Sequence, residues 1–498
     1  MLSTITFQFH QDVQIIIMYM LFSMTICACA YLYRLSYRAQ FSIPVIRSEK
    51  QKWFYRYKLK SKGTWAYSII NNRGIKRFQK QESSSKHKND DKIMLASTLS
   101  NKYHDLPFVS VVIPARNEEK YIERCILSLL KQDYPEFEII VIDDNSTDAT
   151  SKILKNIIDG NNNNNNNTVN TSITSIIAAD RLRIITFKNK PDQWTGKTWA
   201  SQKGFLLSKG EILLFTDADT YYSKRDTILQ AVLYMKREKL DVLTGIPTSE
   251  RLTNFWSKIT NPMWDLLGIL FGVGSVAEVN DPKSKIAYLM GSFFLIKRQV
   301  LINIGTFESV REEIQEDKAL GIIIKERGYE LRLVKLKNMV YTLWADDLTT
   351  LWHGIGRTIA PLIMNNKYKS ILNLLIIFFS CVLPFVLFPI TLSISIQLLT
   401  ASYVQSVQEK YYLLVLYLPV LSLIFCLFVF GFYSMKRSTR GIPFVYTLGA
   451  PFGSGFVFIV CFYYTAMLLV YGKTKSLTWQ GRQYTHSRNN KDIHYKIK

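Results

Sequence analysis

Residues Ile212 to Asp219 read Ile-Leu-Leu-Phe-Thr-Asp-Ala-Asp, an apolar run that ends in two carboxylates. A second apolar run, Ile139 to Ile142, also ends in paired acids, Asp143 and Asp144. Apolar runs of this length are typical of buried strands, and open α/β sheets bind ligands at the carboxyl ends of their parallel strands. A hard divalent cation at such an edge takes oxygen ligands from carboxylates and from a diphosphate. The two runs therefore predict a nucleotide and metal site at one edge of an α/β sheet.

Strands and helices alternate around these runs. We expect strands over 108–114, 137–142, 182–187 and 212–216, and helices over 118–130 and 151–158. This alternation implies a mostly parallel sheet. A tract of seven asparagines, Asn161 to Asn167, interrupts it and is expected as a surface loop, because such a tract cannot bury apolar surface.

The ends of the chain are apolar enough to enter a membrane. Of the 498 residues, 48% are hydrophobic, and long uncharged stretches occur at 15–32, 371–398, 411–433 and 447–471. Basic residues from Arg34 to Lys62 follow the first stretch, and the positive-inside rule then places the following domain in the cytoplasm. We therefore expect a multi-pass protein of the cell membrane with its catalytic part on the cytoplasmic side. The alternative for the first stretch is a cleaved signal peptide.

The net charge of +23 favours an anionic partner. The basic residues near the first apolar stretch alternate with tryptophans and tyrosines, which suits an anionic lipid surface, and no nucleic-acid motif accompanies them. We therefore expect a membrane partner and no nucleic acid. The six cysteines and six histidines show no metal-binding or redox spacing.

Five short motifs occur in order between Phe108 and Trp344. They are 109–119, 141–148, 194–200, 216–219 and the pair Glu316-Asp317. Together they resemble the family 2 glycosyltransferases of the GT-A fold, which transfer a sugar from a nucleotide diphosphate with inversion. The stretch Trp479 to Tyr484 is similar to the Trp-x-Gly-Arg-x-Tyr ending of membrane-bound members related to carotenoid, hopanoid and ceramide glycosylation. The resemblance implies an α/β, Rossmann-like GT-A cytoplasmic domain plus transmembrane α-helices.

The expected parts of the chain are an N-terminal transmembrane helix (1–33), a basic, partly disordered juxtamembrane linker (34–105), a GT-A domain (106–345), an interfacial segment (346–370), about three transmembrane helices (371–472) and a basic tail (473–498). Four full spans place that tail opposite the catalytic domain, which conflicts with the positive-inside rule. One explanation is that a proline-bearing segment, near either Pro384 and Pro389 or Pro443 and Pro451, is re-entrant or split in two. The other is that the positive-inside rule fails at this end of the chain.

The first two strand ends offer a polar wall for a nucleoside. Pro114, Arg116, Glu118 and Asp144 supply groups that can contact a base and ribose, and the resemblance implies Asp144 for the base. Residues 143–148 also suit a turn that caps a helix, so a purely structural role for them is the alternative.

Lys197 follows Gly196 in an expected loop, where a flexible ammonium can reach a diphosphate. A phosphate-binding P-loop is excluded, because the position five before Gly196 is Pro191.

Asp217 and Asp219 flank Ala218, and an extended strand would place both carboxylates on one face. That face can hold Mn²⁺ or Mg²⁺ on the two phosphates. The resemblance implies Asp219 as the direct metal ligand, and Asp217 toward the metal or the ribose. It also implies Asp317 as the general base that takes the proton of the acceptor hydroxyl. Capping of a helix by acids is the alternative for Asp317.

Residues 353–358 depart from the Gln-x-x-Arg-Trp motif of many membrane members, since only Arg357 matches. Arg357 is expected at the donor diphosphate or at lipid head groups. The missing tryptophan argues against processive synthesis. We expect transfer of one sugar from a nucleotide donor to a lipid or polyprenyl-type acceptor in the membrane, and the resemblance implies a UDP-sugar as that donor. The alternatives are a processive polysaccharide synthase and a catalytically inactive protein that binds the membrane surface.

Overall fold

The computed structural model describes residues 20–34, 44–46, 59–61, 64–71, 74–78, 106–159, 180–249, 254–270, 276–342, 347–365, 367–400, 409–439, 442–471, 477–479, 482–489 and 492–497. The asparagine tract and most of the predicted linker lie outside these residues.

An eight-stranded sheet has the order β1-β13-β10-β12-β8-β5-β6-β7. Its strands are β1 (Val45–Ile46), β5 (Val109–Ala115), β6 (Phe137–Asp143), β7 (Leu182–Thr186), β8 (Ile212–Phe215), β10 (Val242–Ile246), β12 (Phe294–Lys297) and β13 (Leu331–Leu336). Neighbours run parallel except at β12, which is antiparallel to both β10 and β8. The prediction of an α/β, mostly parallel sheet is confirmed, and β1 shows that part of the predicted linker joins this sheet.

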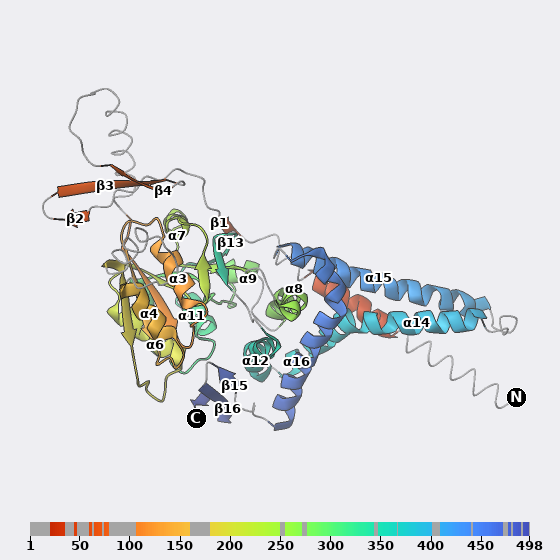
Figure 1. Cartoon of the computed structure of the whole chain (residues 1–498). Helices are drawn as coiled ribbons and strands as arrows, with labels where there is room; N and C mark the ends of the chain where they lie inside the picture. The colour runs from red at the N-terminus through yellow and green to blue at the C-terminus, as the bar shows by residue number, and fades with distance from the viewer. Residues whose placement is uncertain are drawn as a thin grey trace.

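Helices cover both faces of the sheet, because its central strands bury side chains in both directions. Val111 of β5 packs in a core with α3 (Ile122–Leu130), α4 (Thr150–Asp159) and α7 (Thr227–Arg237), whereas Val112 packs in a core with α6 (Gly196–Leu207), α10 (Arg298–Asn303) and α11 (Glu316–Glu326). We call the sheet and these helices the sheet domain (Figure 1).

Short strands complete the described sheets. A three-stranded sheet joins β11 (Thr248–Ser249), β14 (Val340–Thr342) and β9 (Thr220–Tyr222), and the last of these follows the Asp217–Asp219 segment. Strands β2 (Leu59–Ser61), β3 (Thr64–Asn71) and β4 (Gly74–Phe78) form an antiparallel sheet within the predicted linker. Strands β15 (Leu477–Trp479), β16 (Arg482–Asn489) and β17 (Asp492–Ile497) form another in the tail.

The remaining long helices of the described chain are apolar. They are an unlabelled helix at Met20–Arg34, α8 (Phe255–Leu270), α12 (Leu348–Asn365), α13 (Lys367–Ile377), α14 (Leu383–Thr400), α15 (Glu409–Thr439) and α16 (Ala450–Tyr471), with short turns η2 (Phe378–Val382) and η4 (Phe444–Gly449). Within the described residues, three helical segments are long and apolar enough to cross a membrane, namely Lys367–Gln397, Tyr417–Met435 and Phe444–Val470. All four apolar stretches of the sequence are thus helical where they are described.

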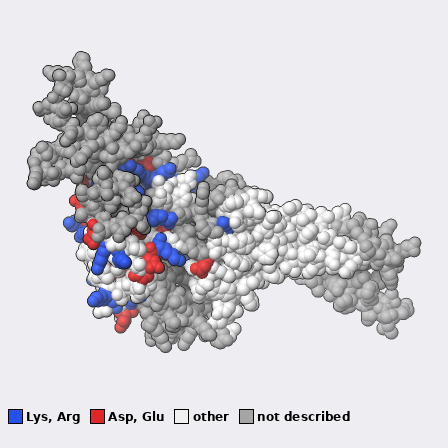
Figure 2. Space-filling model, viewed as in Figure 1, with Lys and Arg blue, Asp and Glu red and all other residues white. Residues whose placement is uncertain are grey.

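The helix at 20–34 lies alongside α14 and α15, and we call these three the helical arm (Figure 1). Phe22 stacks on Phe425 with 6.0 Å between ring centroids, and both pack with Leu383 and Leu387. Figure 2 shows charged side chains over the sheet domain and an almost uncharged surface over the arm. The almost uncharged surface coincides with two of the three helical segments that are long and apolar enough to cross a membrane.

Candidate active site

Two loops at the carboxyl edge of the sheet are tied together by hydrogen bonds. Arg116, after β5, donates from one guanidinium nitrogen to the carbonyl oxygens of Asp144 at 2.5 Å and Asn145 at 3.0 Å. Asn117 donates its backbone N–H to Ser146 Oγ at 3.0 Å. Both Asn117 and Asn145 have positive φ, at 53° and 54°, which asparagine tolerates better than most residues. The predicted polar wall is therefore a pair of mutually fixed loops.

The two acids after β6 have different surroundings. Asp143 Oδ1 accepts hydrogen bonds from the backbone N–H and the hydroxyl of Ser146, at 3.0 and 2.6 Å, and Asp143 Oδ2 accepts from the Ser151 hydroxyl. Asp148 Oδ1 accepts from the backbone N–H of Thr150 at 3.0 Å, at the start of α4. Turn formation and capping thus fall to Asp143 and Asp148. Asp144 directly follows β6 and is buried.

Lys197 lies in the first turn of α6, so the predicted loop at this position is wrong. The helix starts here because Thr195 caps it, with Thr195 Oγ1 accepting from the backbone N–H of Thr198 at 3.2 Å. Thr198 in turn donates its hydroxyl to the carbonyl oxygen of Arg311 at 2.8 Å. These contacts fix the position from which the Lys197 side chain extends.

The ammonium of Lys197 joins two carboxylates that are distant in sequence. Lys197 Nζ lies 2.8 Å from Asp217 Oδ1 and 2.9 Å from Glu316 Oε1. The Glu316 side chain is 7% exposed and that of Asp217 is 35% exposed. Burial alone would lower the pKa of Lys197, but Asp217 and Glu316 outweigh it and raise that pKa well above its ordinary value. The ammonium therefore stays charged at the edge where a diphosphate is expected.

Gly291 closes this ion-pair cluster from the β12 side. Because β12 is antiparallel, the residues before its first residue lie at the edge where β8 ends, and Thr216 Oγ1 donates to the carbonyl oxygen of Ser292 at 2.8 Å. A Cβ atom on Gly291 would lie 2.7 Å from Lys197 Nζ and 3.3 Å from Asp217 Oδ2. The cluster therefore requires glycine here, a role that sequence reasoning missed because it depends on the tertiary contact.

Asp219 lies in a turn, not in an extended strand. Strand β8 ends at Phe215, and the backbone N–H of Thr220 donates to the carbonyl oxygen of Asp217 at 3.2 Å. The prediction that period-two geometry places Asp217 and Asp219 on one strand face is therefore wrong. Their carboxylates nevertheless interact, since burial and then Asp217 raise the pKa of Asp219 to about 7.

The Asp219 carboxylate has the surroundings expected of a cation ligand. Its Oδ1 atom is buried and has no hydrogen-bond partner within the described structure. A buried carboxylate oxygen without a partner is costly unless a cation or donor supplies one. No group of three or more histidine, cysteine or acidic side chains that could hold a metal ion occurs within the described residues. A cation at Asp219 would thus take its remaining ligands from Asp217, water or a bound diphosphate.

Asp317 lies at the start of α11, next to Glu316. Asp317 Oδ1 accepts a hydrogen bond from the backbone N–H of Lys318 at 2.8 Å, and its carbonyl oxygen accepts from the N–H of Leu289 at 3.2 Å. Burial, followed by the charge of Glu316, raises the pKa of Asp317 to about 7. Asp317 combines an anchored backbone with a carboxyl group whose pKa suits proton transfer near neutral pH.

Glu118 belongs to the same electrostatic cluster. Burial, then Asp219 and Asp217, raises its pKa to about 8. Cys125 of α3 also adjoins the cluster and donates its thiol to the carbonyl oxygen of Asp217 at 3.7 Å. The sequence had indicated only a helix residue for Cys125, because its neighbour is 92 positions away.

The other predicted site residues lie as follows. Pro114 is in β5, paired in register with Ile142 of β6. Arg357 lies in α12, and its side chain is outside the described part of the structure. The fold thus brings Glu118, Lys197, Asp217, Asp219 and Asp317 into one electrostatic cluster, with Pro114, Arg116 and Asp144 on neighbouring strand ends.

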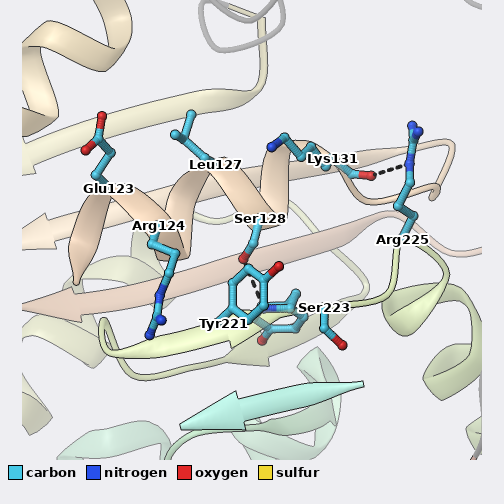
Figure 3. Close-up of a pocket in the computed structure, with 9 residues that line it drawn as sticks. Glu123, Arg124, Leu127, Ser128, Lys131, Tyr221, Ser223 and Arg225 are labelled. Atoms are coloured by element: carbon cyan, nitrogen blue, oxygen red, sulfur yellow. Dashed lines mark hydrogen bonds between the residues drawn. The ribbon is translucent and has the colours of Figure 1, made fainter. Parts of the chain in front are cut away.

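A cavity of about 300 Å³ lies beside this cluster, between α3 and β9 (Figure 3). Arg124, Lys131 and Arg225 contribute cationic groups to its lining, and the Arg124 guanidinium lies 5.2 Å from the centre of the Tyr221 ring. Ser128, on the same lining, accepts a hydrogen bond from the backbone N–H of Tyr222 at 3.0 Å. None of the predicted site residues lines this cavity, so the candidate site is the strand-edge cluster and not this hollow.

Comparisons with known proteins agree with the motifs. Residues 110–305 match the family described as glycosyl transferase family 2. YdaM, a probable glycosyltransferase of Bacillus subtilis, is 27% identical over 231 residues, which are 46% of this chain and 49% of that protein. The beta-monoglucosyldiacylglycerol synthase of a Nostoc species is 30% identical over 158 residues, which are 31% of this chain and 29% of that enzyme.

Among solved structures, the mannosyltransferase PcManGT from Pyrobaculum calidifontis, in complex with GDP-Man and Mn²⁺, is 17% identical with a TM-score of 0.39. The similarity covers 74% of this chain and 95% of that one. The chain spans about half the length of the Bacillus relative and less than a third of the Nostoc enzyme. Residues 110–305 are thus similar in sequence to glycosyl transferase family 2, in the part of the chain that holds most of the motifs.

Proposed function

We propose that the protein transfers a single sugar, with inversion, from a nucleotide-diphosphate donor such as a UDP-sugar to a lipid or polyprenyl-type acceptor held in the membrane. The observation that carries this proposal is the cluster of Lys197, Asp217, Asp219 and Asp317, which sequence-distant segments bring to one sheet edge beside apolar helices. Such a transfer needs a cationic group for the diphosphate, here the Lys197 ammonium, and a carboxylate oxygen that can bind a metal ion, here Asp219 Oδ1. It also needs a carboxyl group with a raised pKa to accept a proton, here Asp317.

Each side chain takes one part of the reaction. Pro114, Arg116 and Asp144 bound the nucleoside, and Lys197 holds the diphosphate through its ammonium. Asp317 accepts the proton of the acceptor hydroxyl as that oxygen attacks the anomeric carbon. The bond from the anomeric carbon to the diphosphate breaks, and the nucleoside diphosphate leaves.

Asp219, with Asp217, would hold Mn²⁺ or Mg²⁺, which supplies charge stabilisation to the departing diphosphate when bound. Glu118, whose carboxyl has a raised pKa beside these acids, stays protonated near neutral pH and thereby limits the negative charge of the cluster.

A lipid acceptor is favoured by the position of the site. Gln315, directly before α11, donates to the carbonyl oxygen of Thr358 in the apolar helix α12 at 3.1 Å. Asp317 therefore lies two residues from a contact with a helix of the apolar part. The Nostoc relative, named as a glucosyldiacylglycerol synthase, supports a lipid product as well.

Two substitutions separate the proposed roles of the acids. Asp317→Asn should abolish transfer and leave donor binding intact, because the base is lost and the diphosphate site is not. Asp219→Ala should remove the Mn²⁺-dependent part of UDP binding, measured by calorimetry with and without the ion. The matched control is Asp159→Asn, an exposed acid at the end of α4.

The substrates are identified by incubating membranes that contain the protein with a panel of labelled nucleotide sugars and finding the lipid fraction that gains label. Full transfer by the Asp317→Asn variant would show that another group is the base. UDP binding by Asp219→Ala that responds to Mn²⁺ as before would remove the metal role of Asp219.

A further inference from the structure

Three helices lie across the base of the helical arm. Figure 1 shows α14, α15 and the helix at 20–34 extending away from the sheet domain, whereas α16 runs across them and α8 and α12 are seen end-on. We call α8, α12 and α16 the transverse helices. Although α16 is long and apolar enough to span a bilayer, it does not run along the helices that extend from the domain.

Close packing joins α16 to the other transverse helices along its length. Val457, Val460, Tyr464 and Leu468 of α16 are buried in one cluster with Ile355 and Ile359 of α12 and Met263 of α8. Gly356 lets the ring of Tyr464 lie directly on α12, and Gly453 lets α16 lie on the backbone of Ile259 in α8. Helix α16 meets α15 in the same cluster through Val429 and Tyr433, which lie in the last third of α15.

The opposite face of α16 is apolar and exposed. Phe452 is 67% exposed, Ile459 56% and Val470 72%. Aromatic rings gather where the transverse helices meet, with Trp352 packed against Tyr463 at 5.4 Å and against Phe456 at 6.0 Å between ring centroids. Tryptophan and tyrosine are enriched at membrane–water interfaces, so we expect this aromatic cluster to lie at the depth of the interface.

Charged residues in the connecting segments fix the direction of each span. Lys367 and Lys369 precede α14, residues 401–408 between α14 and α15 carry no charge, and Lys436, Arg437 and Arg440 end or follow α15. By the positive-inside rule, α14 leaves the cytoplasmic side and α15 returns to it. Lys473, Lys475 and Arg482 follow α16. A crossing by α16 would place them on the side of residues 401–408, where the nearest charged residues are the oppositely charged Glu409 and Lys410.

The tail lies on the side of the sheet domain in the structure. Strand β15, directly after α16, contacts α12, which Gln315 ties to the sheet domain. We propose that α16 lies flat in the cytoplasmic interface of the membrane together with α8 and α12, with its exposed apolar face toward the lipid chains. The chain then crosses the bilayer three times, through the helix at 20–34, α14 and α15, and the conflict with the basic tail disappears.

The depth of α16 in lipid vesicles tests this proposal. Spin labels are placed at Phe452→Cys, Ile459→Cys and Val470→Cys in a Cys27→Ser background, because the other five cysteines are buried. Phe452 and Val470 are 18 positions apart, which corresponds to about 27 Å of helix, close to the thickness of the hydrocarbon core. An interfacial helix gives the three labels the same shallow depth in collision measurements. The control label at Ile424→Cys, exposed on α15, should be deep.

A membrane-impermeant maleimide, applied to sealed inside-out vesicles, shows separately on which side of the membrane the tail lies. Ser487→Cys in the tail and Lys155→Cys in α4 should be labelled equally, and Ser406→Cys only after permeabilisation. Labelling of the tail together with Ser406 would mean that α16 spans the bilayer. A deep label at Ile459 with a tail on the Lys155 side would mean a re-entrant helix, and either result overturns the proposal.

Discussion

Replacement of Gly291 by alanine should impair the site without unfolding the protein. The new Cβ would lie 2.7 Å from Lys197 Nζ, whereas ordinary van der Waals contact begins at 3.4 Å, so the ammonium must move by about 0.7 Å. A shift of that size directed away from both acids would lengthen the ion pairs from 2.8 and 2.9 Å to about 3.5 and 3.6 Å, beyond hydrogen-bond length. The atom that moves is the end of a flexible side chain, so the folding cost is small.

The expected loss follows from the charged hydrogen bonds. A hydrogen bond to a charged group contributes about 1.5–3 kcal/mol, and the lower value applies because the Asp217 side chain is 35% exposed and partly screened. Since about 1.4 kcal/mol is tenfold in rate, kcat/KM for the donor should fall about tenfold. We expect the free energy of unfolding to change by less than about 1 kcal/mol, as for other tolerated surface and glycine changes.

The assay compares kcat/KM for the nucleotide sugar, UDP affinity and the thermal midpoint. Gly455→Ala is the matched control, because a Cβ there meets no atom within 4 Å. Unchanged kcat/KM and UDP affinity in Gly291→Ala would refute the assignment of the Lys197 cluster to the diphosphate. A large drop in the thermal midpoint would instead show that the cluster is mainly structural.

Two further predictions concern Asp317 and Lys325. Burial and Glu316 raise the pKa of Asp317 to about 7, so the ionised base increases as pH rises, and the transfer rate should climb from pH 6 to 8 and then level, as a pH–rate profile would show. In the unfolded chain the same carboxyl group ionises near its ordinary pKa of 3.8, so its contribution to folding stability declines as pH rises from 3.8 to about 7. A flat rate profile would contradict the base assignment. Lys325→Met should lower the free energy of unfolding by about 2 kcal/mol, measured in denaturant against the exposed Lys152→Met, because charge-assisted bonds are lost. Lys325 Nζ donates to the carbonyl oxygens of Glu278, Asp281, Ser284 and Ile286 at 3.0, 2.7, 3.0 and 2.9 Å.

The predicted strands agree with the structure because the signal for them is local. The apolar runs at 108–114, 137–142 and 212–216 correspond to β5, β6 and β8 to within a residue at each end. The helix expected from residue 118 starts at Ile122, since the N–H groups of Tyr121 and Ile122 both donate to the carbonyl oxygen of Glu118 in a preceding turn. The antiparallel strand β12 was not predicted, because its direction is set by pairing with β8 and β10 and not by its own residues.

Local residue patterns identify the buried strands, the apolar helices and the acids that follow the strands. Residue type and spacing control these properties over a few positions. The folded chain was needed to show that Gly291 adjoins Lys197, that Asp219 lies in a turn, and that α16 packs across the helical arm. Each of these depends on surfaces that meet from distant parts of the chain, and no local pattern of hydrophobicity or charge specifies which surface a given residue will meet.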